Sequence, residues 1–261
     1  MSDVTSFQPS WYLRNGHVQT ILASSPFRAW GKNPMCDAAR EMIIKTPEGV
    51  RLQGYYSCQE SKMAVGLVIL LHGWEGSVDS TYITCTGKAL YRRGYDIFRL
   101  NFRDHGDSHR LNPGIFYRID RKPLIRKYFL KKWLQSLKIK QGLFPDLYDF
   151  SSLFSLKTIQ AVTDQMLDQY SEYKSASDYF KNYSILNDTI DDLPVPTTIM
   201  TAADDPIIPV EDFQRLKLNH HTRLVIHTFG GHNGFIDGFF LKSWYEQKLA
   251  DLFDTIVQPI Y

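Results

Sequence analysis

The chain has 261 residues, of which 43% are hydrophobic and 22% are charged, and its formal net charge is +2. This composition supplies a full-sized core for one domain and excludes an intrinsically disordered chain. The near-neutral charge gives no indication of a nucleic-acid partner. No apolar run reaches the roughly eighteen residues of a membrane-spanning helix, and the first residues lack the pattern of a signal peptide.

Three cysteines, Cys36, Cys58 and Cys85, are an odd number without the spacing of a metal site. They fit free thiols in a reducing compartment better than a disulfide framework. The sequence therefore predicts a soluble, cytoplasmic protein.

The first half of the chain predicts strands and a helix in the order of a β-α-β unit. Residues 42–45 and 50–56 alternate between apolar and polar side chains around a Pro-Glu-Gly turn, which predicts an antiparallel hairpin. Residues 64–71 form a continuous apolar run, which predicts a central parallel strand covered by helices on both faces. A helix over 81–93 and a strand over 95–101 complete the unit.

The second half resumes the parallel sheet with predicted strands over 195–201 and 223–227, followed by a last amphipathic helix. Between the halves, apolar side chains recur every four residues in a helical block over about 123–183. They are Ile125, Phe129, Trp133 and Leu137. We interpret this block as a lid inserted into a single α/β domain that covers residues 1–261.

A glycine-containing loop, residues 72–77, follows the first buried strand. Such a loop can bring a backbone N–H close to a substrate, so we assign the N–H of Trp74 to an oxyanion hole. An ordinary strand-to-helix turn is the alternative. The turn over 101–108 at the end of the next strand is predicted only to shape the wall of the site.

Two later loops carry a candidate acid and base. Asp204 and Asp205 follow a strand, where ligands bind in open α/β sheets. His232 lies among glycines after the final strand. The spacing Asp205-Pro-Ile-Ile-Pro favours Asp205 as the triad acid and Asp204 as a loop-bonding carboxylate. The chain order acid then base predicts His232 as the base.

Five motifs in this order resemble the YheT-like branch of the α/β-hydrolases. They are Asn15-Gly-His-Val-Gln-Thr20, Leu71-His-Gly-Trp-Glu-Gly-Ser77, Asn101-Phe-Arg103, Ala203-Asp-Asp-Pro206 and Gly230-Gly-His-Asn-Gly-Phe235. The resemblance implies an α/β-hydrolase fold, with a mostly parallel sheet, helices on both faces and an inserted lid. It also implies a serine esterase that cleaves small or lipid-like acyl esters through a Ser-Asp-His triad, with neither metal nor cofactor.

The nucleophile elbow of that family, Gly-x-Ser-x-Gly, is missing. The Gly pairs four residues apart enclose His232 and Ile236, so no serine, cysteine or threonine occupies the central position. The shortened segment near residues 118–122 predicts the loss of two β-α units from the middle of the sheet. The neighbouring strands would then have unpaired edges or pair with each other. Ser77 and Cys85 are the nearest substitutes, but their predicted positions, in the oxyanion loop and in a helix, argue against both.

The predicted outcome is an inactive or severely impaired hydrolase, and two alternatives remain. The chain could be a non-catalytic module that binds or regulates, or an incomplete product of its gene. Residues 118–140 contain nine Lys or Arg and one acid, a composition that also fits binding to RNA or to a membrane surface. We favour an amphipathic lid helix, because the apolar stripe accounts for the aromatic residues. This interpretation predicts no nucleic-acid partner and is compatible with peripheral membrane contact. His105 and His109 have the spacing of two zinc ligands on a helix, but no third ligand is evident in the sequence, so we do not predict a metal site.

Overall fold

The computed structural model describes residues 6–60, 63–114, 123–171, 173 and 190–256 of the chain. The chain divides into two compact units: unit 1 comprises residues 1–32 and 183–261, and unit 2 comprises residues 33–182. Each unit is described by itself. The single domain over 1–261 stays a prediction.

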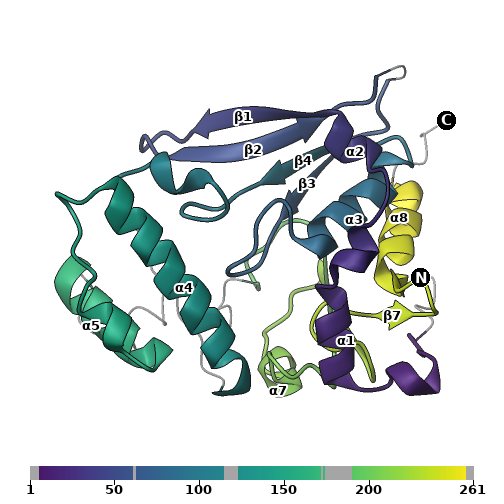
Figure 1. Cartoon of the computed structure of the whole chain (residues 1–261). Coiled ribbons are helices and arrows are strands. Elements are labelled where there is room, and N and C mark those ends of the chain that lie inside the picture. Colours follow the sequence, from purple (N-terminus) through teal and green to yellow (C-terminus); the bar gives the residue numbers. More distant parts are fainter. Residues whose placement is uncertain (1–5, 61–62, 115–122, 172, 174–189, 257–261) are drawn as a thin grey trace. The chain divides into compact units, whose positions relative to one another are not determined.

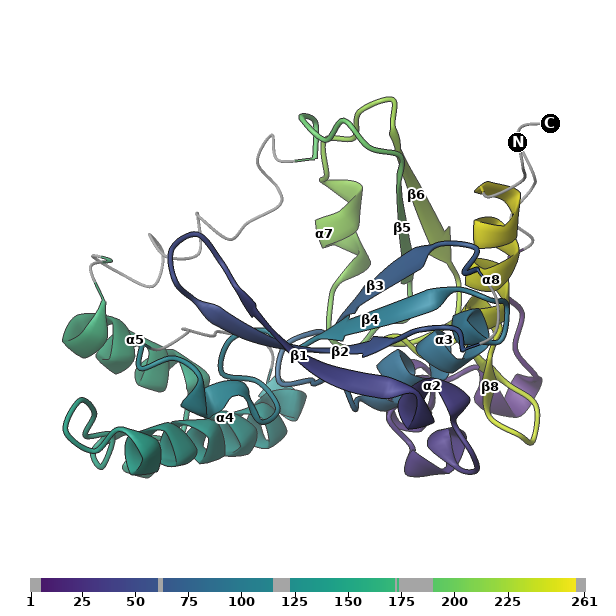
Figure 2. The ribbon, with the colours of Figure 1, turned by 90° about the horizontal axis from the view of Figure 1, so that it is seen from above.

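Unit 2 contains a four-stranded sheet in the order β1-β2-β4-β3, whose strands lie side by side in Figure 2. The elements of this part are α2 (Pro34–Asp37), β1 (Ala39–Lys45), β2 (Arg51–Ser57), β3 (Leu67–Leu71), α3 (Thr81–Tyr91), β4 (Asp96–Leu100) and η3 (Ser108–Arg110). Strands β1 and β2 form the predicted antiparallel hairpin, and β3 pairs with β4 in parallel. The predicted β-α-β unit is therefore confirmed.

Strand β3 differs from the prediction at its surface. Leu67, Ile69 and Leu71 are 57%, 58% and 52% exposed, whereas Val68 between them is 6% exposed. Because side chains alternate along a strand, one face of β3 is buried and the other is open. The expectation that helices cover this strand on both faces is therefore wrong. Helix α3 packs against β3 and β4, and no described element of unit 2 buries the opposite face of β3.

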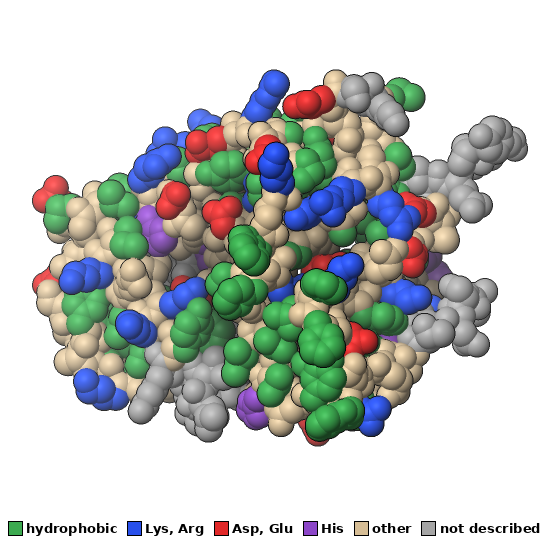
Figure 3. Space-filling model, turned by 45° about the vertical axis from the view of Figure 1, so that its right-hand side comes forward, with side chains coloured by type: hydrophobic (Ala, Val, Ile, Leu, Met, Phe, Trp, Pro, Cys, Tyr) green, Lys and Arg blue, Asp and Glu red, His purple; other side chains and the backbone are tan. Residues whose placement is uncertain are grey.

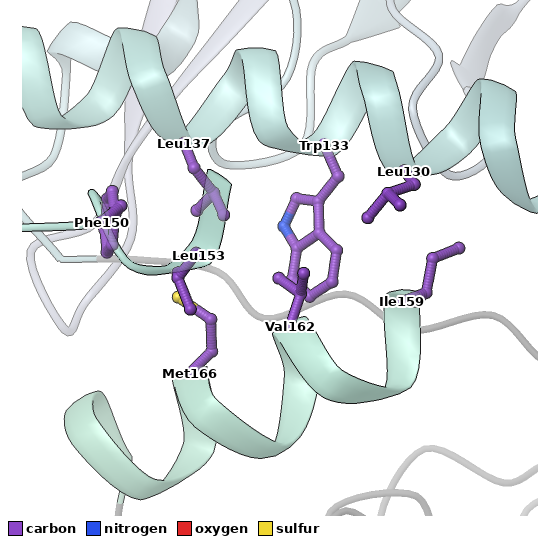
Figure 4. Packing of buried hydrophobic residues seen from close by; sticks show 8 residues of the cluster. All are labelled: Leu130, Trp133, Leu137, Phe150, Leu153, Ile159, Val162 and Met166. Carbon is purple, nitrogen blue, oxygen red and sulfur yellow. The ribbon is translucent and has the colours of Figure 1, made fainter. Parts of the chain in front are cut away.

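The segment predicted as a lid contains two helices, α4 (Pro123–Leu143) and α5 (Ile159–Tyr170), with the short η4 (Leu153–Ser155) between them. Their facing sides form one apolar cluster, shown in Figure 4. Its buried members are Leu130, Trp133, Leu137, Phe150, Leu153, Ile159, Val162 and Met166. The stripe predicted on the first helix is confirmed for Trp133 and Leu137. The side chain of Ile125, the junction over 118–122 and the end of the predicted lid over 174–183 lie outside the described residues.

A buried ion pair attaches α4 to the loop after β4. The Lys140 Nζ lies 2.8 Å from the Asp104 Oδ1, and both side chains are almost fully buried. The same ammonium donates hydrogen bonds to the carbonyls of His109 and Asn112. Burial lowers the pKa of Lys140, while its hydrogen bond and charge interaction with Asp104 oppose that shift. One of the basic residues of this helix therefore serves packing within unit 2.

Unit 1 contains both ends of the chain (Figure 1). It includes a second parallel pair of strands, β5 and β6, which are labelled in Figure 2. Its elements are η1 (Trp11–Leu13), α1 (Gly16–Ala23), η2 (Pro26–Ala29), β5 (Thr197–Ala202), α7 (Val210–Gln214), β6 (Thr222–His227), β7 (Ile236–Asp237), β8 (Lys242–Ser243) and α8 (Trp244–Ile256). Phe7, Ala202 and Phe235 form its small buried core.

The described strands form three separate sheets, and β3 and β5 each have a single partner. Within the described residues, one edge of each of these strands is therefore unpaired. The loss of central strands stays a prediction. The α/β class, with parallel strand pairs and helices between them, agrees with the predicted fold. None of the described helices has the length and apolar character needed to span a bilayer.

Candidate active site

The predicted acid and base of unit 1 are in contact. The His232 Nδ1 lies 3.0 Å from the Asp205 Oδ2. The Asp205 side chain is 6% exposed and that of His232 is 30% exposed. A carboxylate accepts the Nδ1–H of the imidazole, which leaves the Nε2 lone pair as the basic atom. This is the orientation in which a histidine can remove a proton from a hydroxyl group or from water.

The second oxygen of Asp205 is held by the backbone. Its Oδ1 accepts the N–H groups of Ile207 at 2.7 Å and Ile208 at 3.0 Å. Burial alone would raise the pKa of the Asp205 carboxyl, but the His232 hydrogen bond and charge and these two N–H groups together lower it. The carboxylate therefore stays ionised, which suits an acid that orients and stabilises a protonated imidazole.

Asp204 has a different role in the same loop. Its Oδ1 accepts the Gly231 N–H at 2.8 Å, and its Oδ2 is buried without a hydrogen-bond partner among the described residues. Burial raises the pKa of this carboxyl. Asp204 thus fastens the loop that carries His232, as expected of a loop-bonding carboxylate.

The His232 loop has an unusual backbone. Four of its residues have positive φ angles: Gly230 (150°), Gly231 (54°), Asn233 (58°) and Phe235 (48°). The left-handed region is unfavourable for a bulky residue such as Phe235, so neighbouring contacts must hold this turn. A Cβ on Gly231 would lie 2.4 Å from the Gly16 carbonyl oxygen, so this position needs glycine for space as well.

Those neighbouring contacts come from α1. In the sequence, this segment served only as one of the five motifs that carry the family resemblance. Asn15 caps the helix by accepting the N–H groups of His17 and Val18. Thr20 accepts the backbone N–H of His232 at 2.9 Å and donates its own hydroxyl to the Gly16 carbonyl at 2.7 Å. Helix α1 therefore holds the His232 loop in place through hydrogen bonds.

Gln19 of the same helix is fully buried and makes further hydrogen bonds around the His232 loop. Its Nε2 donates to the carbonyls of Leu13 at 2.8 Å and Ile236 at 2.9 Å, and its Oε1 accepts the Ile236 N–H at 2.7 Å. Gln19 and Thr20 are adjacent polar residues in an otherwise apolar stretch of this helix. This pattern was the sequence signal for buried hydrogen bonds, because polar side chains are buried only when they are hydrogen-bonded.

Trp74, the predicted oxyanion residue, belongs to unit 2 and lies in the turn after β3. Its ring stacks on Phe129 with the centroids 4.6 Å apart. The turn is shaped by a left-handed Glu75 (φ 55°) and by the Gly73 N–H, which donates to the Tyr82 hydroxyl at 2.6 Å. No described residue accepts the Trp74 backbone N–H. The group is therefore available as a donor, and the oxyanion role stays a prediction.

The turn after β4 is a hydrogen-bonded framework. His72 accepts the Phe102 N–H at its Nε2, 3.1 Å away. Asn101 accepts the Val78 N–H at 2.9 Å and donates to Gln53 at the same distance. These contacts are those of residues that shape a loop, in line with the wall role expected for this turn.

Ser77 and Cys85, the two substitute nucleophiles considered, both lie in unit 2. The Ser77 Oγ accepts the Asp79 N–H at 3.1 Å within its own turn, and Cys85 lies in α3. His109 pairs with Ser136 of α4, whose Oγ lies 2.6 Å from its Nε2, and the His109 Nδ1 lies 3.0 Å from the Gly106 carbonyl oxygen. Within the described ranges, no cluster of three His, Cys, Asp or Glu could hold a metal ion.

Comparison with known proteins gives partial matches. No protein-family model matches the chain. It is 26% identical to mouse phospholipase ABHD3 over 123 residues, which is 46% of this chain. It is 29% identical over 116 residues, 41% of this chain, to a candidate esterase of Synechocystis, slr0264. The chain is similar to ester-cleaving hydrolases.

The matched segments make up 30% of the length of each of these relatives. Among solved structures, the Pyrococcus furiosus esterase Pf2001 aligns over 88% of this chain and 96% of its own, with a TM-score of 0.49 and 14% identity.

Proposed function

We propose that the chain is an α/β-hydrolase-type scaffold that binds small or lipid-like acyl esters and hydrolyses them only weakly. The observation that carries this proposal is the Asp205–His232 contact at 3.0 Å, with the imidazole Nε2 left as a base. We place the chain in the YheT-like branch on its five motifs. The phospholipase and esterase names of the two relatives support an ester as substrate.

The chemistry open to this pair is general-base hydrolysis. Water attacks the ester carbonyl, and His232 Nε2 takes the proton that water loses. The imidazolium, stabilised by the Asp205 carboxylate, returns this proton to the departing alkoxide. A backbone N–H donor would stabilise the oxyanion that forms in between.

The missing elbow sets the expected rate. Without a serine there is no acyl-enzyme, and removing the nucleophile from a complete triad lowers kcat by roughly a million-fold. A positioned general base contributes roughly 100- to 10,000-fold, so the Asp205–His232 pair would still accelerate hydrolysis over water by about that factor. Turnover should therefore be slow and should show no burst of the first product.

The test is hydrolysis of a short-chain p-nitrophenyl ester by folded protein. Replacing His232 by Ala should lower the rate by about 100-fold or more, because the general base is removed. His221→Ala is the matched control, since that histidine is exposed in the same unit. Equal rates for wild type and His232→Ala would contradict the proposal.

A non-catalytic binding module is the second candidate, favoured by the absence of any Gly-x-Ser-x-Gly elbow in the sequence. It predicts that wild type and His232→Ala both fail to exceed the buffer rate. Both should still bind a non-hydrolysable ether analogue of the ester with equal affinity.

A further inference from the structure

Unit 1 exposes a group of large apolar side chains, here called the aromatic patch. Its members are 44% to 92% exposed. They are Trp11, Tyr12, Ile21, Phe27, Phe239 and Phe240. Hydrophobic side chains gather in one area of the face drawn in Figure 3. Soluble proteins seldom expose so many large apolar side chains together without a binding role.

Contacts within unit 1 join three of the turns that carry the patch. The Tyr12 ring lies 5.7 Å from that of Trp11 and 6.3 Å from that of Phe239, centroid to centroid. Arg28 donates to the Leu241 carbonyl at 3.1 Å, which ties η2 to the turn between β7 and β8. Three separate turns are thereby brought to one surface.

The most exposed members stand at the tip of a fixed turn. Phe239 and Phe240 are 92% and 86% exposed and lie between Gly238 (φ 69°) and Leu241 (φ 50°). The Leu241 N–H donates to the Gly238 carbonyl at 3.2 Å and closes the turn. Two adjacent phenylalanines are therefore held outward by the backbone.

The charges around the patch are mainly basic. Residues 6–32 contain three Lys or Arg and no Asp or Glu. Arg28 is paired with Glu246, but Arg14 and Lys32 are exposed, as is Lys242 beside the patch. The one acidic residue of the β7–β8 hairpin, Asp237, accepts the Ser10 N–H and hydroxyl. An anionic surface would complement this arrangement.

We propose that the aromatic patch docks unit 1 on an anionic lipid bilayer, with Trp11, Phe239 and Phe240 entering the headgroup region. Apolar tips that project from turns can enter a bilayer surface, whereas docking of a helix needs a groove. Trp and Tyr favour this interface because they are apolar with one polar atom, and neighbouring Lys and Arg reach the lipid phosphates. The proposal needs no turnover, so it stands or falls independently of the proposed function.

The test is flotation of the intact chain with vesicles of mixed phosphatidylcholine and phosphatidylserine. Wild type should float with these vesicles and less with pure phosphatidylcholine. The double variant Phe239→Ser/Phe240→Ser should lower the partition coefficient by roughly tenfold for each phenylalanine removed. Trp11→Ser, at a different turn, should weaken binding independently. Circular dichroism should show both variants folded, because these side chains are exposed.

Tyr128→Ser is the matched control, since Tyr128 is an aromatic residue that is 57% exposed on the basic helix α4 of unit 2. It should leave flotation unchanged. The proposal is overturned if folded wild type does not float, if the double variant floats as wild type does, or if only the α4 variant loses binding. It is also overturned if wild type dimerises, the double variant is monomeric and neither binds vesicles, because the patch would then join two copies of the chain.

Discussion

Thr20 contacts the backbone of the candidate base and should therefore position its imidazole. Replacing it by Val keeps the shape of the side chain but leaves the His232 N–H without its acceptor. We expect the His232 loop to loosen and the contact with Asp205 to lengthen. The measurement is the downfield proton NMR signal of the His232 Nδ1–H, which should be present in wild type and lost in Thr20→Val.

Thr20→Ser is the control, since it keeps the hydroxyl and should restore the signal. A general loss of stability would affect both variants alike, whereas a positioning role separates them. An unchanged signal in folded Thr20→Val would show that Thr20 does not position His232.

The two neighbouring carboxyls should act on stability in opposite directions with pH. The pKa of Asp205 is lower in the folded chain than its usual 3.8, so its contribution is present above that pH and is lost as pH falls through the folded pKa. Asp205→Asn should therefore flatten the loss of stability on acidification. The pKa of Asp204 is raised by burial, so its ionised form opposes folding, and this opposition is relieved as pH falls.

Asp204→Asn should thus make the acid-induced loss of stability steeper, as measured by urea unfolding at several pH values. The same change in slope for both variants would contradict the contrast between the two carboxyls.

At the level of single residues, the sequence predicted the two side chains that meet in unit 1 but not the residues that support them. Chain order and strand ends predicted Asp205 and His232, and the structure brings them into contact. Thr20 and Gln19 were missed as supporting residues. Their partners lie more than 200 residues away, and no local pattern reports such a contact.

At the level of elements, the attachment of α4 depends on Lys140. Lys140→Met would leave the Asp104 carboxylate buried without its cation, so the free energy of unfolding should fall by about 3–5 kcal/mol. Lys138→Met is the matched control, because that side chain is exposed on the same helix and should change stability by less than about 0.5 kcal/mol. Thermal and urea unfolding provide the comparison, and equal losses in the two variants would show that the buried pair is not the anchor.

The elements themselves were largely predictable, while their surroundings were not. The apolar run before His72 correctly predicted the strand β3, and the alternation before and after the Pro-Glu-Gly turn correctly predicted the hairpin. The run also predicted a strand covered on both faces, yet Leu67, Ile69 and Leu71 are exposed. Apolar periodicity shows what a strand can bury, but whether a cover exists depends on segments elsewhere in the chain.

At the level of the whole molecule, one fact of the sequence connects the fold and the chemistry. The sequence contains no Gly-x-Ser-x-Gly elbow, which predicts the loss of both the nucleophile and the strands that would pair beside it. Within the described residues, β3 of unit 2 and β5 of unit 1 each have one strand partner. The acid and base remain together in unit 1, since α1 and the two strand-end loops that form their surroundings all belong to that unit.

The central claim is that the chain retains an acid–base pair without a serine nucleophile. The most direct test is the intact mass of folded protein after treatment with a fluorophosphonate probe, with heat-denatured protein as the control. We predict no adduct that depends on folding. A folding-dependent adduct, mapped to one residue by peptide analysis, would reveal a nucleophile within this chain and contradict the account.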